Sequence, residues 1–259
     1  MHQEIGADQA YQDFTLGLAI EGLKDTAGKI EGALQGEIPV SNHDGMHAMI
    51  YRRPFGVVLG IGPWNAPYHL GFRAVTFALA AGNTTILKGP ELSPRCYWAI
   101  ADVFRQAGLP DGCLNLIFHR PEDAGTVTEQ LIENIHVRKV NSTGSSRVGS
   151  IIAALAGKHP KPCLMELGGK ASAIVMPDAD LDVAALSCAM GSFMNAGQRA
   201  HPCSLIGCCY VPVPPWPGYQ SNIRRPLKHS KGENSWLCQA ESRSDRSGSV
   251  QGRRSAAWK

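Results

Sequence analysis

The fold is decided by residues 56–65, which read GVVLGIGPWN. The first six form a short apolar run, the pattern of a strand that is buried on both faces. The run leads directly into a turn containing Gly, Pro and Asn, and a helical pattern begins at residue 66. A buried strand followed at once by a helix is the beginning of a βαβ unit, so this stretch predicts a parallel sheet.

Strands and helices alternate in the same way along the following residues. Further strands are expected at residues 84–87, 113–118, 135–140, 164–167 and 173–176. Helices are expected at residues 66–81, 93–107, 121–133, 145–156 and 181–196. Ser93 is expected to cap the helix that begins with Pro94, and two acids, Asp178 and Asp180, lie at the start of the last helix. The chain is therefore predicted to have an α/β fold with a parallel, Rossmann-like sheet.

The chain before residue 56 predicts one long helix and one strand. Between residues 10 and 35, apolar side chains recur at alternating steps of four and three residues, beginning with Leu16, Ile20 and Leu23. This spacing favours an amphipathic helix, and Gly36 is expected to end it. Residues 47–53 alternate loosely between apolar and polar and are predicted to form a strand.

The composition is typical of a globular protein with a sizeable core, because 44% of the 259 residues are apolar and 18% are charged. No stretch is apolar over the roughly 18 residues that a membrane-spanning helix needs. The first residues also lack the basic start and apolar centre of a signal peptide. A cytoplasmic location without a membrane partner is therefore expected, and the eight cysteines are expected to be reduced.

Residues 199–259 differ in character from the rest of the chain. They carry ten Lys and Arg against three Asp and Glu (net +7), which leaves fifteen against nineteen (net −4) in residues 1–198. Their apolar residues do not recur at the spacing of a helix or a strand, so they are predicted to be a disordered tail. One hypothesis for their origin is translated non-coding or frame-shifted sequence. The basic residues follow no pattern that favours a nucleic-acid partner. No metal is expected either, because no zinc motif matches the spacing of His201, Cys203, Cys208 and Cys209.

Two polar motifs follow the first two strands of the predicted sheet. Asn65 ends the turn Gly62-Pro63-Trp64-Asn65, where its amide can stabilise a developing oxyanion, although such a turn is equally an ordinary structural element. Lys88 and Glu91 lie in the LKGPE sequence of residues 87–91, at the carboxyl end of a strand, where parallel α/β proteins bind ligands. This pair can hold ribose hydroxyls or can form a solvated ion pair.

Two motifs rich in small residues follow later strands. Residues 142–149 read STGSSRVG and open a helix, so their backbone N–H groups can approach a pyrophosphate, although the common G-x-G-x-x-G fingerprint is absent. Residues 165–170 read MELGGK and place the Glu166 carboxylate at the end of a strand. A partly buried glutamate in such a position can act as a general base.

Taken together, in this order and spacing, the motifs resemble those of the NAD(P)-dependent aldehyde dehydrogenase superfamily. The family shows P-W-N, K-x-x-E, F-T-G-S-T/S-x-x-G, E-L-G-G-K, P-D-A-D-L-D and G-Q-x-C in succession. This chain carries the matching residues at 63–65, 88–91, 143–149, 166–170, 177–182 and 195–198. The resemblance covers about residues 10–198, and the stretch 65–94 looks similar to the aromatic-aldehyde branch, such as vanillin and salicylaldehyde dehydrogenases.

The resemblance implies an activity and catalytic roles. In the intact family, an aldehyde, NAD and water give a carboxylate and NADH. Asn65 would be the oxyanion donor, and Glu166 would activate the water that hydrolyses the thioester. The nucleophilic cysteine should be the second residue after Gln198, but that residue is Ala200. The chain is therefore expected to be truncated relative to the family after Gln198 and catalytically impaired, since Cys203 lies three residues too far along to substitute.

The resemblance also implies a cofactor and partners. NAD is expected rather than NADP, because the Glu91 carboxylate would repel a 2′-phosphate. The expected cofactor contacts are Ile61, Pro63, Trp64, Lys88, Glu91, Gly144, Ser145, Val148, Leu167 and Gly168. Ser142 replaces the family's Phe, which loosens packing beneath the cofactor.

The partner would be a small aldehyde. The family forms homo-oligomers, but the strand that pairs its subunits follows Gln198 and has no counterpart here.

These expectations divide the chain into four parts. Residues 1–54 would hold an N-terminal helix and strand, 55–165 the NAD-binding domain, 166–198 the start of the catalytic domain, and 199–259 a tail unrelated to the family. Two alternatives to an active dehydrogenase stay open. They are a non-catalytic NAD-binding pseudoenzyme fragment and an erroneous gene model. The alanine at position 200 distinguishes both alternatives from an active enzyme. The composition of residues 199–259 distinguishes the pseudoenzyme fragment from the erroneous gene model.

Overall fold

A computed structural model describes residues 1–169, 173–176, 178–193, 195 and 198. By its internal contacts the chain divides into residues 1–209 and 210–259, and all of the described residues belong to the first unit. The predicted disordered tail, residues 199–259, lies outside the described residues. None of the described helices is long and apolar enough to cross a membrane.

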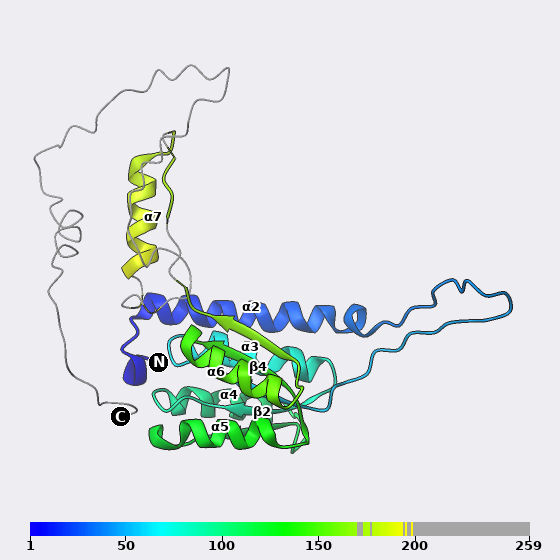
Figure 1. Ribbon diagram of the computed structural model, residues 1–259. Helices are drawn as coiled ribbons and strands as arrows, with labels where there is room; N and C mark the ends of the chain where they lie inside the picture. The colour runs from blue at the N-terminus through cyan, green and yellow to red at the C-terminus, as the bar shows by residue number, and fades with distance from the viewer. Residues whose placement is uncertain (170–172, 177, 194, 196–197, 199–259) are drawn as a thin grey trace, which may run out of the picture. The chain divides into compact units, whose positions relative to one another are not determined.

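The centre of the first unit is a five-stranded sheet in which all neighbouring strands are parallel (Figure 1). Its strands are β1 (Val57–Ile61), β2 (Thr84–Lys88), β3 (Leu114–Ile117), β4 (Val137–Gly144) and β5 (Cys163–Leu167). The spatial order is β3-β2-β1-β4-β5, so the chain moves outward from β1 to β3 and then returns to the other side of β1. The predicted parallel α/β fold is therefore confirmed, and the strand order reverses between β1 and β4.

Helices connect the successive strands and bury the sheet from both sides. The connecting helices are α3 (Pro67–Ala80), α4 (Pro94–Gln106), α5 (Ala124–Glu133, after the 3-10 turn Pro121–Asp123) and α6 (Ser146–Lys158). One core cluster joins α3 and α4 to the sheet through Val75, Tyr97 and Leu87. A second joins α5 and α6 to the sheet through Ile132, Ile152 and Leu59. The central strand β1 is covered on both faces, which explains why its sequence is a continuous apolar run instead of an alternation.

Three further helices lie outside the βαβ units. They are α1 (His2–Ile5), α2 (Gln9–Leu34) and α7 (Leu181–Phe193). The predicted helix at 10–35 is confirmed as α2, which packs along α3 (Figure 1). The start of α7 is also as predicted, because the Asp180 carboxylate accepts hydrogen bonds from the backbone N–H groups of Asp182 and Val183, each at 3.0 Å. The described part of the helix reaches Phe193, and residues 194 and 196 of the predicted range lie outside the described residues.

The prediction that Ser93 caps α4 is right in position but wrong in chemistry. The Ser93 hydroxyl is buried and makes no capping hydrogen bond. The cap is supplied by Glu4 of α1, whose carboxylate accepts from the backbone N–H groups of Arg95 (2.8 Å) and Cys96 (3.0 Å). Burial acts to raise the pKa of Glu4, but its hydrogen bonds with Cys96 and Arg95 and the positive N-terminus outweigh burial and lower that pKa.

Two predicted strands are wrong, and one strand is longer than predicted. Residues 47–53 make a single antiparallel bridge, between Ile50 and Glu37, and residues 173–176 form no strand. An apolar alternation becomes a strand only where a neighbour pairs with it. Conversely, β4 continues to Gly144 instead of ending at residue 140, because β1 pairs with it as far as Ser142 and β5 pairs with it as far as Gly144. The domain boundaries at residues 54, 165 and 198 stay predictions.

Candidate functional site

The carboxyl ends of the strands form one edge of the sheet. In register, Ile61 of β1 pairs with Lys88 of β2 on one side and with Ser142 of β4 on the other. One step further along, Thr143 of β4 pairs with Glu166 of β5. Ligands of open parallel sheets bind outside this edge, where the strand order reverses. The crevice between β1 and β4 is therefore the candidate site.

All of the residues that the sequence assigns to the site lie at or next to this edge. Ile61, Lys88, Gly144, Glu166 and Leu167 are the last residues of their strands or adjoin them. The others follow a strand end or stand in the first turn of α6, and they are Pro63, Trp64, Asn65, Glu91, Ser145, Val148 and Gly168. The structure thus brings together residues from four segments that are far apart in the sequence.

The amino end of α6 has the construction of an anion site. The Ser145 hydroxyl caps the helix by accepting from the backbone N–H of Val148 at 3.3 Å, and it can still donate its own proton. Ser146 donates to the carbonyl oxygen of Gly168 at 2.7 Å, which ties α6 to the end of β5. Among the described residues, no atom lies within 4 Å of the position that a Gly144 side chain would take. N–H groups at an open helix end can therefore hold a phosphate group.

The turn after β1 is held from beneath by a buried tyrosine. Tyr97 of α4 is fully buried, and its hydroxyl donates to the carbonyl oxygen of Pro63 at 2.9 Å. A side chain at Gly62 would overlap that hydroxyl, so the ring and the turn approach closely. Burial raises the pKa of Tyr97, which keeps this donor protonated. The turn that presents Asn65 is therefore rigidly positioned.

Asn65 faces the residues that precede the expected nucleophile position. Its side-chain Nδ2 donates to the carbonyl oxygen of Gln198 at 2.7 Å, and Asn195 Nδ2 donates to the carbonyl oxygen of Asn65 at 3.1 Å. The Asn65 Oδ1 is buried without a hydrogen-bond partner among the described residues. Ala200 itself lies outside the described residues.

Glu166 has a partner that the sequence did not reveal. Arg73 of α3 places its Nη2 3.4 Å from Glu166 Oε2 and donates to the Thr143 hydroxyl at 3.3 Å. The side chains of Arg73 and Glu166 are 33% and 51% exposed, so this ion pair adds little to stability and serves mainly to orient the carboxylate. The sequence signal that could have pointed to this partner is Arg73 itself, a charged residue among the apolar residues of the 67–80 helix.

Lys88 also has a partner that was missed. Its side chain is buried, and its Nζ lies 2.6 Å from Nε2 of His119, which follows β3. Burial lowers the pKa of Lys88, while the neighbouring Glu91 carboxylate acts in the opposite direction. His119 stands at a strand end, so the rule that placed Lys88 at the ligand-binding edge would also have placed His119 there.

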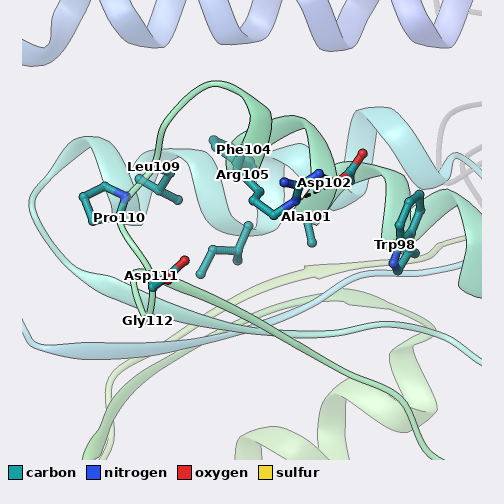
Figure 2. Close-up of a pocket in the computed structure, with 10 residues that line it drawn as sticks. Trp98, Ala101, Asp102, Phe104, Arg105, Leu109, Pro110, Asp111 and Gly112 are labelled. Atoms are coloured by element: carbon teal, nitrogen blue, oxygen red, sulfur yellow. Dashed lines mark hydrogen bonds and ion pairs between the residues drawn. The ribbon is translucent and has the colours of Figure 1, made fainter.

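A cavity of about 240 Å³ lies elsewhere, along the outer side of α4 (Figure 2). Trp98, Phe104 and Arg105 line it from α4, and residues 109–112 close it from the loop that enters β3. An ion pair at 2.6 Å joins Arg105 to Asp102 across its rim. The loop leads to the amino end of β3, so this cavity is separate from the carboxyl edge.

Within the described part of the chain, no three His, Cys, Asp or Glu side chains gather as metal ligands. His201 and the cysteines that were considered for zinc lie outside the described residues. The chemistry available at the candidate site is therefore that of an amide donor, a carboxylate, a buried ammonium group and an open helix end.

The fold is that of a Rossmann-like α/β protein, and the residues that the sequence assigns to a site lie at the carboxyl edge of its sheet. The model of the aldehyde dehydrogenase family matches residues 1–211. The chain therefore belongs to the aldehyde dehydrogenase family.

Two relatives connect the chain to aromatic aldehydes. It is 48% identical over 195 residues to a vanillin dehydrogenase of Pseudomonas sp. (strain HR199 / DSM 7063), covering 75% of this chain and 40% of that protein. It is similar to the crystal structure of a salicylaldehyde dehydrogenase from Pseudomonas putida G7 complexed with salicylaldehyde, with a TM-score of 0.74 and 37% identity over 76% of this chain and 40% of that one. The chain spans about 40% of the length of the curated relatives it matches.

The family uses NAD or NADP, and structures similar to this one do not decide between them. A succinic semialdehyde dehydrogenase from Streptococcus pyogenes in complex with NADP+ matches with a TM-score of 0.69 and 27% identity, over 77% of this chain and 42% of that one. The choice of cofactor must therefore come from individual residues and not from the fold.

Proposed function

We propose that this chain provides the cofactor site and part of the active site of an aldehyde dehydrogenase that oxidises an aromatic aldehyde to a carboxylate. The observation that carries this proposal is the joint placement of Asn65, Lys88, Ser145 and Glu166 at one sheet edge. The similarity to vanillin and salicylaldehyde dehydrogenases supports the aromatic substrate class. A cytoplasmic location is a further part of the proposal.

The residues present fit a nicotinamide dinucleotide. The open amino end of α6 suits a pyrophosphate, and Lys88 at the end of β2 suits ribose hydroxyls. Glu91 is exposed and three residues beyond Lys88, so its charge would oppose a 2′-phosphate and favours NAD over NADP. When bound, the nicotinamide ring accepts the hydride that the aldehyde carbon gives up. Leu167 and Gly168, at the end of β5, are proposed to line its side of the site.

Two side chains of this chain have proposed catalytic roles. The Asn65 amide, fixed on the turn above Tyr97, donates a hydrogen bond to the oxygen that becomes negative at the aldehyde carbon. Glu166, oriented by Arg73, takes a proton from the water that attacks the acyl group.

We also propose that this chain does not complete the reaction by itself. Alanine at position 200 has no thiolate, so it forms no bond to the aldehyde carbon. The second candidate function is therefore a non-catalytic NAD-binding protein, which the intact strand ends and the open α6 terminus favour. The third hypothesis is an erroneous gene model, in which residues 199–259 are translated non-coding or frame-shifted sequence. It is tested by sequencing the mature transcript across codon 198.

The deciding experiment measures NADH absorbance and NAD binding together. The purified chain and its Ala200→Cys variant are supplied with NAD and a panel of aromatic and aliphatic aldehydes, and NAD binding is followed by calorimetry. Turnover by the variant alone supports the dehydrogenase proposal. Binding without turnover in either protein favours the non-catalytic function. Turnover by the unmodified chain contradicts the role of position 200, and absence of binding contradicts the cofactor site.

A further inference from the structure

His119 contacts the ammonium group that the cofactor site depends on. It lies two residues beyond Ile117, which is the register partner of Lys88 in the neighbouring strand. The Lys88 Nζ and His119 Nε2 atoms are 2.6 Å apart, a short distance for two nitrogen atoms in a hydrogen bond. The short connection from the strand end to the imidazole holds the two side chains together at the carboxyl edge.

The two hydrogen-bond partners of His119 indicate which of its ring nitrogens carries the proton. An ammonium group only donates, so Lys88 donates and Nε2 accepts. The other ring nitrogen, Nδ1, lies 2.9 Å from the carbonyl oxygen of Arg120, which only accepts, so Nδ1 carries the proton. Both contacts together require the neutral Nδ1–H tautomer. A doubly protonated ring would place two cations in contact and lose its acceptor.

The charged side chains near Lys88 and His119 do not take the place of His119 as the hydrogen-bond acceptor of Lys88. Glu91 is on the loop after β2 and is exposed. Arg120, beside His119, is held by Asp123 at 2.8 Å and lies 3.6 Å from Glu122. Lys88 is 8% exposed, so a buried ammonium group that lost its acceptor would either move toward solvent or remain unpaired. The position of Lys88 therefore depends on His119.

We propose that His119 is the positioning residue for Lys88: its neutral ring accepts the Lys88 ammonium proton and holds that group at the cofactor ribose, and protonation of the ring releases it. The consequence for the cofactor rests on the proposed function, because it assumes that Lys88 contacts NAD. Cofactor affinity then falls as the pH falls, through a side chain that need not contact the cofactor.

The first test is the dissociation constant of NAD for the full chain at about pH 8 and about pH 5.5, a range over which histidine changes charge. We expect NAD to bind the unmodified chain about tenfold more weakly at the lower pH, the loss expected when one charge-assisted hydrogen bond is removed. His119→Gln keeps an acceptor at every pH and should bind with little pH dependence. His119→Phe has no acceptor and should bind weakly at both. His136→Gln, an exposed histidine before β4, is the control and should behave as the unmodified chain.

The second test does not need NAD. Nitrogen-15 NMR of the full chain labelled at histidine reports which ring nitrogen of His119 carries the proton, with His119→Gln used to assign the signal. Two results together support the proposal: the unmodified chain shows the Nδ1–H tautomer of His119 at about pH 8, and the tautomer changes in the Lys88→Met variant. The Nε2–H tautomer overturns it, as does an equal loss of NAD affinity at low pH in the unmodified chain and in His119→Gln. If the chain binds no NAD, the proposed cofactor site fails, while the tautomer still decides whether His119 holds Lys88.

Discussion

Gly149, in the first turn of α6, lies so close to Leu167 at the end of β5 that a side chain at position 149 would overlap the leucine methyl groups. With the Leu167 side chain in this position, the helix packs against the strand end without room for a side chain at residue 149. This contact sets how near the amino end of α6 lies to the edge where the cofactor is proposed to bind.

Gly149→Ala should destabilise the fold by about 1–3 kcal/mol, because the extra methyl group pushes α6 away from β5. The measurement is chemical denaturation of both proteins, with NAD binding followed in parallel. Gly157→Ala is the matched control in the same helix, since no atom in the described part of the chain lies within 4 Å of its added carbon. That variant should be neutral or more stable by up to about 1 kcal/mol. Equal effects of the two substitutions would contradict the proposed close packing.

Glu4→Gln should lower the free energy of unfolding at neutral pH by about 1 kcal/mol, the usual contribution of a helix cap. The folded protein lowers the pKa of Glu4 below the ordinary value of 4.5. The carboxylate therefore adds stability above that value, and the contribution is lost as the pH falls through the lowered pKa. The difference between the two proteins should accordingly disappear in acid. Glu31→Gln, on the exposed side of α2, is the control; a constant difference at all pH values would rule out the charged cap.

Tyr97→Phe should cost about 1–3 kcal/mol, because it leaves the buried carbonyl oxygen of Pro63 without its 2.9 Å hydrogen bond. Tyr51→Phe removes a hydroxyl from a ring that is 73% exposed and should change stability by less than about 0.5 kcal/mol. Thermal and denaturant unfolding of both variants give the comparison. If Tyr97→Phe is as neutral as Tyr51→Phe, the turn before Asn65 is not held by this contact.

Glu91→Gln should raise the affinity for NADP relative to NAD several-fold, because it removes a carboxylate that opposes a 2′-phosphate. The effect should shrink at high salt, since Glu91 is exposed and its charge is screened. Calorimetric titration with both cofactors measures the ratio, and Glu129→Gln on the exposed face of α5 serves as control. An unchanged ratio would remove Glu91 from the proposed basis of cofactor choice.

Most of the sheet could be predicted from local patterns. The five strands were expected within a few residues of their observed positions, because apolar runs bounded by turn residues report burial directly. The two wrong strands, at 47–53 and 173–176, have similar local patterns but no paired neighbour along their length among the described residues. The extra length of β4 has the opposite cause, since its neighbours extend it beyond the point where its apolar residues end.

By itself, the sequence determined the parallel α/β architecture and the residues that stand at the carboxyl edge, because burial, turns and helix starts are encoded in neighbouring residues. Only the tertiary structure decided which side chains meet there. Arg73 reaches Glu166, His119 accepts from Lys88, and Glu4 caps α4 instead of Ser93. Each of these contacts joins elements that are distant in the chain, and a periodic pattern carries no information about the distance between two elements once they have packed.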